Sequence, residues 1–353
     1  MATNPNVEKE CLAWYAQNKE LYNACGNSMQ RLLTTLLQQA NIPVHSIQYR
    51  IKEQRSFLDK CMDSRYTSPL DEITDVCGLR VITYTNKDVD DICRIIEKHF
   101  NIDWDHSVNK AELLHANEVG YLSVHYIAKL NDARAKLEEY MPYSNVRFEI
   151  QVRTLLQHAW AEIEHDRSYK FSGELPKDIK RRFFLVAGTL ELMDREFNLL
   201  AQEIEQYAAE VHAETKSGNL EFDIDSTSLM EYLKVKLKKY PQIESTFNGR
   251  DKAIIQELFD CDISTLDKLD AIMDDSIIQS IYGSSTPEAG ENYLGLLRGI
   301  LMATMPERYF TKAWKNNWGA IESDEYNKLV SINPELAKYQ KCFDVVPSCN
   351  VFE

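Results

Sequence analysis

The chain has 353 residues, which is enough for one large domain or two domains of ordinary size. Its hydrophobic content of 44% supports packed cores and excludes an intrinsically disordered protein. The formal net charge is −15, with acidic residues in excess in both the N-terminal and the C-terminal parts. That balance excludes a broad DNA-coating surface, and so DNA as a partner, while leaving room for a local basic pocket.

The cysteines and the N-terminus indicate the compartment. None of the eight cysteines forms a Cys-x-x-Cys pair, and several fall in apolar patterns, so we expect buried free thiols rather than a zinc site. The N-terminal residues lack a basic region followed by an apolar stretch, and no segment approaches a membrane-spanning length. We therefore expect a cytoplasmic protein without a membrane partner.

Hydrophobic periodicity predicts strands interleaved with helices over the first 210 residues or so. The expected elements are helices at 7–40 and 43–62, a strand at 76–84, a helix at about 88–99, strands at 121–130 and 146–153, and helices at 154–165 and about 178–212. Such interleaving is typical of an α/β or α+β domain.

The pattern of residues 216–353 differs from that of the first part of the chain. Residues 216–225 are rich in turn residues and end in a helix N-cap signal, which predicts a linker. Residues 226–353 are helical in pattern and contain no recognisable chemistry. The expected organisation is a domain at 1–215, a linker at 216–225, and a helical regulatory or oligomerisation domain at 226–353.

The segment around residues 147–154 is the most informative. Its alternation places three apolar and three polar side chains on opposite faces of a strand, namely Phe148, Ile150 and Val152 against Glu149, Gln151 and Arg153. A row of acid, amide and guanidinium groups is costly to bury, which is typical of a strand that lines a site. Beyond Thr154 the period becomes helical, and His158, Glu162 and His165 share one helical face. That spacing suits a metal, but hydrogen bonding to the strand or to a phosphate is favoured.

Arg50, Lys52, Ser56 and Lys60 form a second candidate cluster. On a helix the last three would recur at every fourth residue and make a polyphosphate-binding stripe, although a solvated helix face explains the pattern as well.

Asp75, Gly78 and Arg80 form the third cluster, at the start of an apolar strand. An acid there suits Mg²⁺ or a turn, and Gly78 suits a bulge or a close backbone approach. Strict alternation would place Arg80 opposite Asp75, so a shared ligand requires a bulge or a site that wraps the strand edge.

Tyr121, Ser123 and His125 lie on one face of the fourth candidate segment. A tyrosine beside a hydroxyl and an imidazole suits stacking and hydrogen bonding to a nucleobase, which is worth roughly 1–3 kcal/mol per base. An ordinary amphipathic strand also explains this pattern.

Together, the order and spacing of these clusters resemble the synthetase domain of RelA/SpoT proteins over about residues 40–175, and the flanking long helices fit the family's small alarmone synthetases. The matching motifs are Arg50-x-Lys52, Asp75-x-x-Gly78-x-Arg80, Gly120-Tyr121-x-Ser123-x-His125, Glu149-Ile150-Gln151-Val152-Arg153-Thr154, Trp160-Ala161-Glu162-Ile163-Glu164-His165 and Tyr169-Lys170. The resemblance implies a nucleotidyltransferase-like α+β domain, with a mixed sheet flanked by helices, followed here by a helical domain.

The resemblance also implies an activity, transfer of the β,γ-pyrophosphate of ATP to a ribose 3′-hydroxyl. By it, Asp75 and Glu149 would be catalytic and would bind Mg²⁺. Residues that would bind ATP are Arg50, Lys52, Ser56, Lys60, Arg80, Gln151, Arg153 and His158. The acceptor would bind at Tyr121, Ser123 and His125. The chain lacks the glycine-rich loop of P-loop ATPases. A single histidine, His45, precedes Arg50, so we expect no alarmone hydrolase activity.

The segment expected to bind the acceptor departs from the family pattern. Alarmone synthetases commonly carry a basic residue after the stacking tyrosine, whereas this chain has Leu122. A guanosine di- or triphosphate needs cationic partners, so this departure favours the family's toxic branch, which modifies the 3′ CCA end of tRNA.

Three hypotheses follow. The family default is an alarmone synthetase that uses GDP or GTP. The alternative is a tRNA-modifying toxin that its C-terminal domain restrains until a protein trigger binds. The third is a catalytically inactive nucleotide-binding regulator. A homo-oligomer is compatible with each of them.

Overall fold

The computed structural model describes residues 5–109, 123–170, 176–241, 243, 251–283, 292–315 and 318–347. The chain divides into two compact units, Met1–Ala201 and Gln202–Glu353, and the boundary falls within helix α8 (Lys177–Ser217). The linker expected at residues 216–225, between domains at 1–215 and 226–353, stays a prediction.

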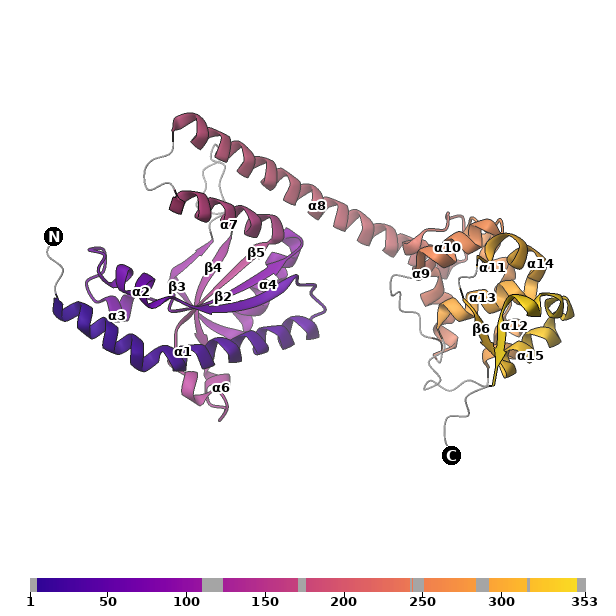
Figure 1. The fold of residues 1–353 in the computed structure, drawn as a ribbon, viewed down its shortest axis with the longest axis horizontal. Coiled ribbons are helices and arrows are strands. Elements are labelled where there is room, and N and C mark those ends of the chain that lie inside the picture. Colours follow the sequence, from indigo (N-terminus) through magenta and orange to yellow (C-terminus); the bar gives the residue numbers. More distant parts are fainter. Residues whose placement is uncertain are drawn as a thin grey trace. The chain divides into compact units, whose positions relative to one another are not determined.

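A five-stranded mixed sheet forms the centre of the first unit (Figure 1). Its strands are β1 (Ser46–Ile51), β2 (Cys77–Thr83), β3 (Phe100–Asn109), β4 (Val124–Leu130) and β5 (Phe148–Thr154). In the order β1-β2-β5-β4-β3, the central pair β2–β5 is parallel and the other pairs are antiparallel. The expected α+β class with a mixed sheet is confirmed.

Helices cover both faces of this sheet. The α-helices described in this unit are α1 (Pro5–Gln39), α2 (Gln54–Cys61), α3 (Pro69–Glu72), α4 (Asn86–His99), α6 (Asp132–Ala135), α7 (Leu155–Lys170) and the N-terminal part of α8. Figure 1 shows α1 running along one side of the sheet and α7 over the other. The core lies between the apolar sheet face and helices α1 and α4, with Leu79, Val81, Phe148 and Ile150 fully buried.

Local sequence explains where two of these helices begin. Thr85 and Asp88 exchange hydrogen bonds as a capping box at the start of α4. The change from strand to helix after β5 has a similar origin. Thr154 N–H donates to Gln157 Oε1 at 3.0 Å, and Gln157 N–H donates to Thr154 Oγ1 at 3.1 Å. These paired bonds satisfy backbone donors that the first helical turn leaves free.

Two expectations for the first unit are wrong. Residues 43–62 are not one helix but strand β1 followed by α2, because Ile47, Tyr49 and Ile51 alternate and pack toward the core while the backbone pairs with β2. The strand β3 was missed altogether. Asn41, with a φ of 54°, marks the expected break after α1.

The second unit is mostly helical, as expected, with its own core. Its α-helices are α9 (Ser226–Lys236), α10 (Asp251–Asp260), α11 (Leu266–Ile272), α12 (Asp275–Tyr282), α13 (Tyr293–Thr304), α14 (Pro306–Arg308) and α15 (Ser323–Ile332). The shorter elements are η2 (Leu237–Lys239), the π-helical turn η4 (Tyr309–Ala313), η5 (Pro334–Cys342), and strands β6 (Ala320–Glu322) and β7 (Asp344–Val346), which pair in parallel.

The described cysteines are as the sequence predicted. All described cysteines are free thiols and all but Cys342 are buried. Within the described ranges, no helix combines the length and the apolar character needed to cross a membrane.

Candidate active site

The polar face of the sheet places the candidate residues in two neighbouring rows. Antiparallel pairing aligns Arg50 of β1 with Gly78 of β2, and parallel pairing aligns Gly78 with Glu149 of β5. Two residues along, the next row is Gln48, Arg80, Gln151 and, on β4, His125. Residues two apart on a strand share a face, so both rows face away from the apolar core.

These rows form the floor of a cavity of about 750 Å³. Eight of the residues expected to bind ATP or metal line it, namely Arg50, Lys52, Ser56, Lys60, Asp75, Arg80, Glu149 and Gln151. They come from three strands, from helix α2 and from the two loops that precede α2 and β2. A cavity with convergent polar groups is the usual form of a small-molecule site.

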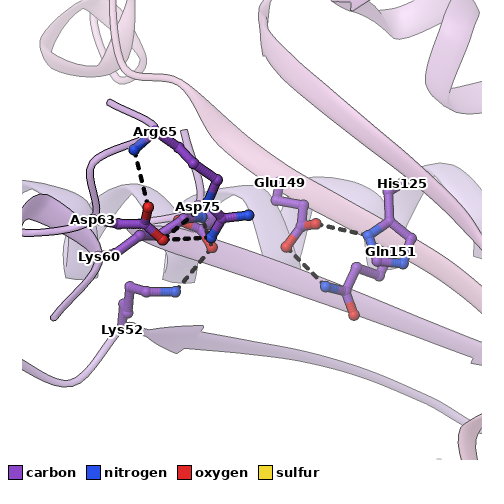
Figure 2. A network of polar contacts seen from close by, with 8 residues as sticks. All are labelled: Lys52, Lys60, Asp63, Arg65, Asp75, His125, Glu149 and Gln151. Carbon is purple, nitrogen blue, oxygen red and sulfur yellow. Dashed lines mark hydrogen bonds and ion pairs between the residues drawn. The ribbon is translucent and has the colours of Figure 1, made fainter. Parts of the chain in front are cut away.

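Asp75 is held by two lysines (Figure 2). Lys52 Nζ and Lys60 Nζ both donate to Asp75 Oδ2, at 2.9 and 2.8 Å. The other oxygen, Oδ1, is buried and has no hydrogen-bond partner among the described residues. Burial by itself would raise the pKa of Asp75, but the hydrogen bonds from Lys60 and Lys52 outweigh it and hold the pKa below its ordinary value. Asp75 is therefore an ionised carboxylate at neutral pH.

Glu149 is the second carboxylate, and its partners lie on the same sheet face (Figure 2). Glu149 Oε1 accepts a hydrogen bond from His125 Nδ1 at 2.8 Å, and Oε2 accepts one from Gln151 Nε2 at 2.8 Å. Arg153 Nη2 in turn donates to Gln151 Oε1 at 2.6 Å. Burial would raise the pKa of Glu149, but the hydrogen bonds from His125 and Gln151 and the charge of His125 together outweigh it, so the pKa lies below its ordinary value.

Asp75 and Glu149, two of the carboxylates that line the cavity, are thus both ionised at neutral pH. The pKa of Glu149 also responds to the charge of Asp75, which tends to raise it. Two like charges at one site are stabilised by a shared cation.

Asp75 and Arg80 face the cavity together without a bulge. Strand β2 begins at Cys77, so Asp75 belongs to the preceding loop and is not subject to the alternation that governs Gly78 and Arg80. Of the two possibilities that the sequence left open, a bulge and a site that wraps the strand edge, the bulge is not needed. The close approach expected at Gly78 does not require glycine, because a Cβ atom there would meet Glu149 Oε2 at 3.8 Å, an ordinary van der Waals distance.

The expected helical stripe is also wrong in its geometry. Lys52 lies between β1 and α2, and only Ser56 and Lys60 are on the helix. Lys52 reaches the cavity because its N–H donates to the Val76 carbonyl and its own carbonyl accepts from Tyr15 of α1. These bonds bring Lys52 and Lys60 to one carboxylate.

Four of the expected residues that the structure describes do not line the cavity, namely Ser123, His125, Arg153 and His158. Arg153 and Ser123 are buried in the first unit, and His158 lies on α7 beside Glu162, with 3.8 Å between His158 Nδ1 and Glu162 Oε1. Burial and the neighbouring Arg80 lower the pKa of His158. Tyr121 lies outside the described residues, as does the start of the strand expected at 121–130.

The structure adds residues that the sequence patterns did not single out. Arg65 lines the cavity and pairs with Asp63, with Arg65 Nη2 2.6 Å from Asp63 Oδ2. Gln48 also lines it, and the alternation in residues 46–51 could have revealed it. Arg80 Nη1 donates to Glu162 Oε1 at 2.8 Å, a contact over 82 positions that no local pattern indicates.

The lysine–Asp75 cluster makes a prediction about stability. At neutral pH, Asp75→Asn is expected to lower the free energy of unfolding by about 1–3 kcal/mol, because the ammonium groups of Lys52 and Lys60 then lack their carboxylate. The folded-state pKa of Asp75 lies below its ordinary value of 3.8. Its stabilisation is therefore complete above pH 3.8 and is lost as the pH falls through the folded-state pKa. Urea denaturation over a pH series should show wild type and variant converging in acid; a constant difference would contradict the assignment.

Comparisons with known proteins agree on one family. The model of the region found in RelA / SpoT proteins matches residues 49–174. GTP pyrophosphokinase YjbM of Bacillus subtilis (strain 168) is 30% identical over 172 residues, which are 47% of this chain and 76% of that protein. GTP pyrophosphokinase YwaC of the same organism is 23% identical over 168 residues, or 46% and 76% of the two chains.

Solved structures with similar folds include small alarmone synthetase 1 from Bacillus subtilis, with 22% identity, coverage of 55% of this chain and 98% of that chain, and a TM-score of 0.47. Another is a GTP pyrophosphokinase family protein from Streptococcus pneumoniae, with 23% identity, coverage of 55% and 96%, and a TM-score of 0.46. On the strength of the family model and the sequence relatives, the chain belongs to the RelA/SpoT family and is an enzyme of the GTP pyrophosphokinase type.

Proposed function

We propose that this enzyme transfers the β,γ-pyrophosphate of ATP to the ribose 3′-hydroxyl of GDP or GTP. The observation that carries the proposal is the cavity, in which four cations accompany the carboxylates of Asp75 and Glu149, all within the segment that matches the RelA/SpoT region. The cations are those of Arg50, Lys52, Lys60 and Arg80. The names of the relatives, both GTP pyrophosphokinases, support guanosine nucleotides as acceptors.

The cations of the cavity are mostly paired with carboxylates of the same chain, and a bound nucleotide could replace those carboxylates. Lys52 and Lys60 are paired with Asp75, Arg65 with Asp63, and Arg80 with Glu162. Arg50 is exposed and has no ion-pair partner among the described residues. Phosphate oxygens would take over the lysine and arginine donors, since charge-assisted bonds to phosphate are stronger than neutral ones.

Release of the lysines from Asp75 would free that carboxylate for Mg²⁺. Asp75 Oδ1 is buried without a described partner, and Mg²⁺ is usually held by one or two carboxylates together with substrate phosphates and water, so the residues fit the ion. In this proposal Asp75 and Glu149 hold it. When bound, Mg²⁺ neutralises charge that develops on the transferred phosphates.

The reaction needs alignment more than covalent help from the protein. The acceptor 3′-hydroxyl gives up its proton to solvent while its oxygen forms a bond to the β-phosphorus of ATP. The bond from that phosphorus to the bridging α,β-oxygen breaks, and AMP leaves. Arg50, Lys52, Lys60 and Arg80 would orient the phosphates and hold them in line. Gln151 and Arg153 would keep Glu149 in place through the hydrogen bonds described above.

The acceptor would lie on the β4 side of Glu149. Two polar atoms of β4 and its approach, Ser123 Oγ and His125 Nε2, are buried without hydrogen-bond partners among the described residues. Buried polar groups are normally satisfied, so these atoms are suited to bonds with an acceptor. Tyr121, next in line on the chain, would stack on the acceptor base.

A transfer assay tests the proposal. The full chain and residues 1–215 would be incubated with γ-³²P-ATP, Mg²⁺ and a mixture of GDP, GTP and deacylated tRNA. We expect label on the guanosine nucleotides, at least about tenfold above label on tRNA, and none when EDTA removes the metal.

One sequence feature favours a second candidate acceptor. Leu122 gives no cation next to the stacking tyrosine, which suits a tRNA 3′ end better than a free guanosine polyphosphate. Label on tRNA, appearing mainly with residues 1–215, would replace the first proposal by that of a toxin restrained by its C-terminal unit. No transfer to any acceptor, despite ATP binding, would instead indicate a nucleotide-binding regulator.

A further inference from the structure

The second unit contains a cavity of its own, with a volume of about 610 Å³. Residues of α10, α13, α15 and strand β6 line it, together with Trp318, which lies just before β6. The cavity therefore belongs to one unit and shares no lining residue with the candidate active site. Its volume is in the range of cavities that hold small-molecule ligands.

Part of the cavity wall is apolar. Leu294, Met302 and Ile321 line the cavity and are buried in the second unit. The half-buried Trp318 adds an aromatic ring to this wall. An apolar wall with one aromatic ring suits a ligand with a planar, aromatic body.

A buried network of hydrogen bonds fixes two of the lining residues. Trp318 Nε1 donates to the Tyr309 hydroxyl at 2.8 Å, and that hydroxyl donates to Glu257 Oε2 at 3.0 Å. Arg298 Nε and Nη2 donate to the same carboxylate. Because Tyr309 and Glu257 are fully buried, Trp318 and Arg298 are held in place before any ligand arrives. Such preorganisation lowers the entropic cost of binding.

Lys252 supplies the cavity with positive charge. Glu257 neutralises Arg298, whereas the exposed Lys252 has no ion-pair partner among the described residues. The first turns of α10 and α13 also line the cavity, and helix N-termini carry a partial positive charge. An anionic group of a ligand would therefore be stabilised near Lys252.

Glu325 supplies a hydrogen-bond acceptor from α15. Its Oε1 accepts from the Tyr282 hydroxyl at 2.7 Å. A carboxylate offers about four acceptor positions, so Glu325 can also accept a ring N–H from a ligand. An aromatic wall, an acceptor for a ring N–H and a lysine together suit a planar nitrogen heterocycle that carries a carboxylate or a phosphate.

Gly295 leaves part of this space open. A Cβ atom at Gly295 would meet Asn292 Oδ1 at 3.8 Å and the Tyr282 hydroxyl at 3.9 Å, which are ordinary contact distances. At Gly299, one turn further along α13, a Cβ atom would lie 3.1 Å from the Tyr282 hydroxyl, so close packing explains that glycine. Glycine is one of the least favourable residues in a helix, and packing does not require it at position 295. Its effect there is to enlarge the cavity.

We propose that the second unit binds a small acidic nitrogen heterocycle in this cavity. The ring lies against Trp318, a ring N–H donates to Glu325, and the acidic group lies near Lys252. Carboxylates and phosphates share this chemistry, so the acidic group is the part of the ligand that experiment must distinguish. The site is independent of the acceptor that the first unit uses.

Isothermal titration calorimetry of the full chain tests the proposal, with indole-3-acetate and GMP as separate probes. We expect saturable binding with a Kd below about 1 mM, and the tighter probe identifies the acidic group as carboxylate or phosphate. Gly295→Leu should weaken that binding at least about tenfold, because the leucine side chain occupies the cavity. Leucine is a better helix former than glycine, so the variant should keep the Tm of wild type or exceed it.

A second pair of variants tests the position of the acidic group. Lys252→Gln should weaken indole-3-acetate several-fold and leave the neutral indole-3-acetamide unchanged, because only the acid interacts with the lysine charge. Lys341→Gln is the matched control, since Lys341 is an exposed lysine of η5 that does not line the cavity, and it should change neither Kd.

Two outcomes would contradict these assignments. If neither probe shows a binding event that Gly295→Leu weakens, the proposed site is wrong. If Lys252→Gln weakens the acid and the amide equally, the acidic group does not lie at Lys252.

Discussion

Asp75→Asn and Glu149→Gln are each expected to lower kcat/KM for pyrophosphate transfer by about 10³-fold or more, because each substitution removes a charge that would hold Mg²⁺ at the transferred phosphates. Both substitutions keep the size of the side chain, so packing is maintained. The expected loss of kcat/KM is larger for Asp75→Asn, because the Asp75 carboxylate also positions Lys52 and Lys60. Initial rates with ATP and a guanosine nucleotide, over a range of Mg²⁺ concentrations, measure the effect.

Asp63→Asn is the matched control for these variants. Asp63 also lines the cavity and pairs with Arg65, but its partner is largely exposed and its charge is not needed to hold the metal in our proposal. We expect a change of less than about tenfold, in keeping with the small energies of exposed ion pairs. Equal losses for Asp63→Asn and Asp75→Asn would show that net charge, and not the two proposed metal-binding carboxylates, controls the rate.

Arg298→Met is expected to destabilise the second unit by about 3–5 kcal/mol, because it leaves the carboxylate of Glu257 buried without its cation. Glu257 is 1% exposed. Arg298 Nε and Nη2 donate to its two oxygens at 3.0 and 2.7 Å, and the hydroxyl of Tyr309 donates to Oε2 at 3.0 Å. Trp318 Nε1 donates to that hydroxyl at 2.8 Å, so the network joins α10, α13 and η4. Denaturant unfolding followed by tryptophan fluorescence measures the loss.

Two controls separate burial of charge from loss of contact. Lys315→Met removes the cation of an exposed pair, in which Lys315 is 61% exposed and its Nζ lies 2.7 Å from Asp260, and it should cost less than about 1 kcal/mol. Combining Arg298→Met with Glu257→Leu should recover much of the stability, since no buried charge then remains. A double variant less stable than Arg298→Met alone would show that the ion pair itself, and not its desolvation balance, stabilises this unit.

Strand β5 shows how much of the site is predictable from local sequence. Strict alternation of apolar and polar residues identified both its apolar face and the polar row of Glu149, Gln151 and Arg153, of which Arg153 is buried. Strand β5 lies between β2 and β4, so one of its faces must pack on the core. Its sequence therefore alternates clearly between apolar and polar residues. Helix α4 was equally evident from its apolar stripe.

Strand β1 shows where local reasoning fails. Its residues are half-buried or exposed, and it forms an edge of the sheet, so its alternation is weak and a helical reading of residues 43–62 competed with it. Pairing with β2 makes residues 46–51 a strand, because backbone hydrogen bonds to a neighbouring strand override modest helix or strand propensities. That pairing is what places Arg50 beside Gly78 and Glu149.

The sequence by itself determined the alternation of strands and helices, the polar face of β5, the helical character of the second unit and, through the order of its motifs, the family. Only the tertiary structure decided which charges meet: Lys52 and Lys60 on Asp75, His125 on Glu149, and Arg80 on Glu162. The physical reason is the distance along the chain over which each kind of information acts. Periodicity reports which side of an element is buried, whereas ion pairs between distant segments depend on strand order and register, which are set by the packing of the whole domain.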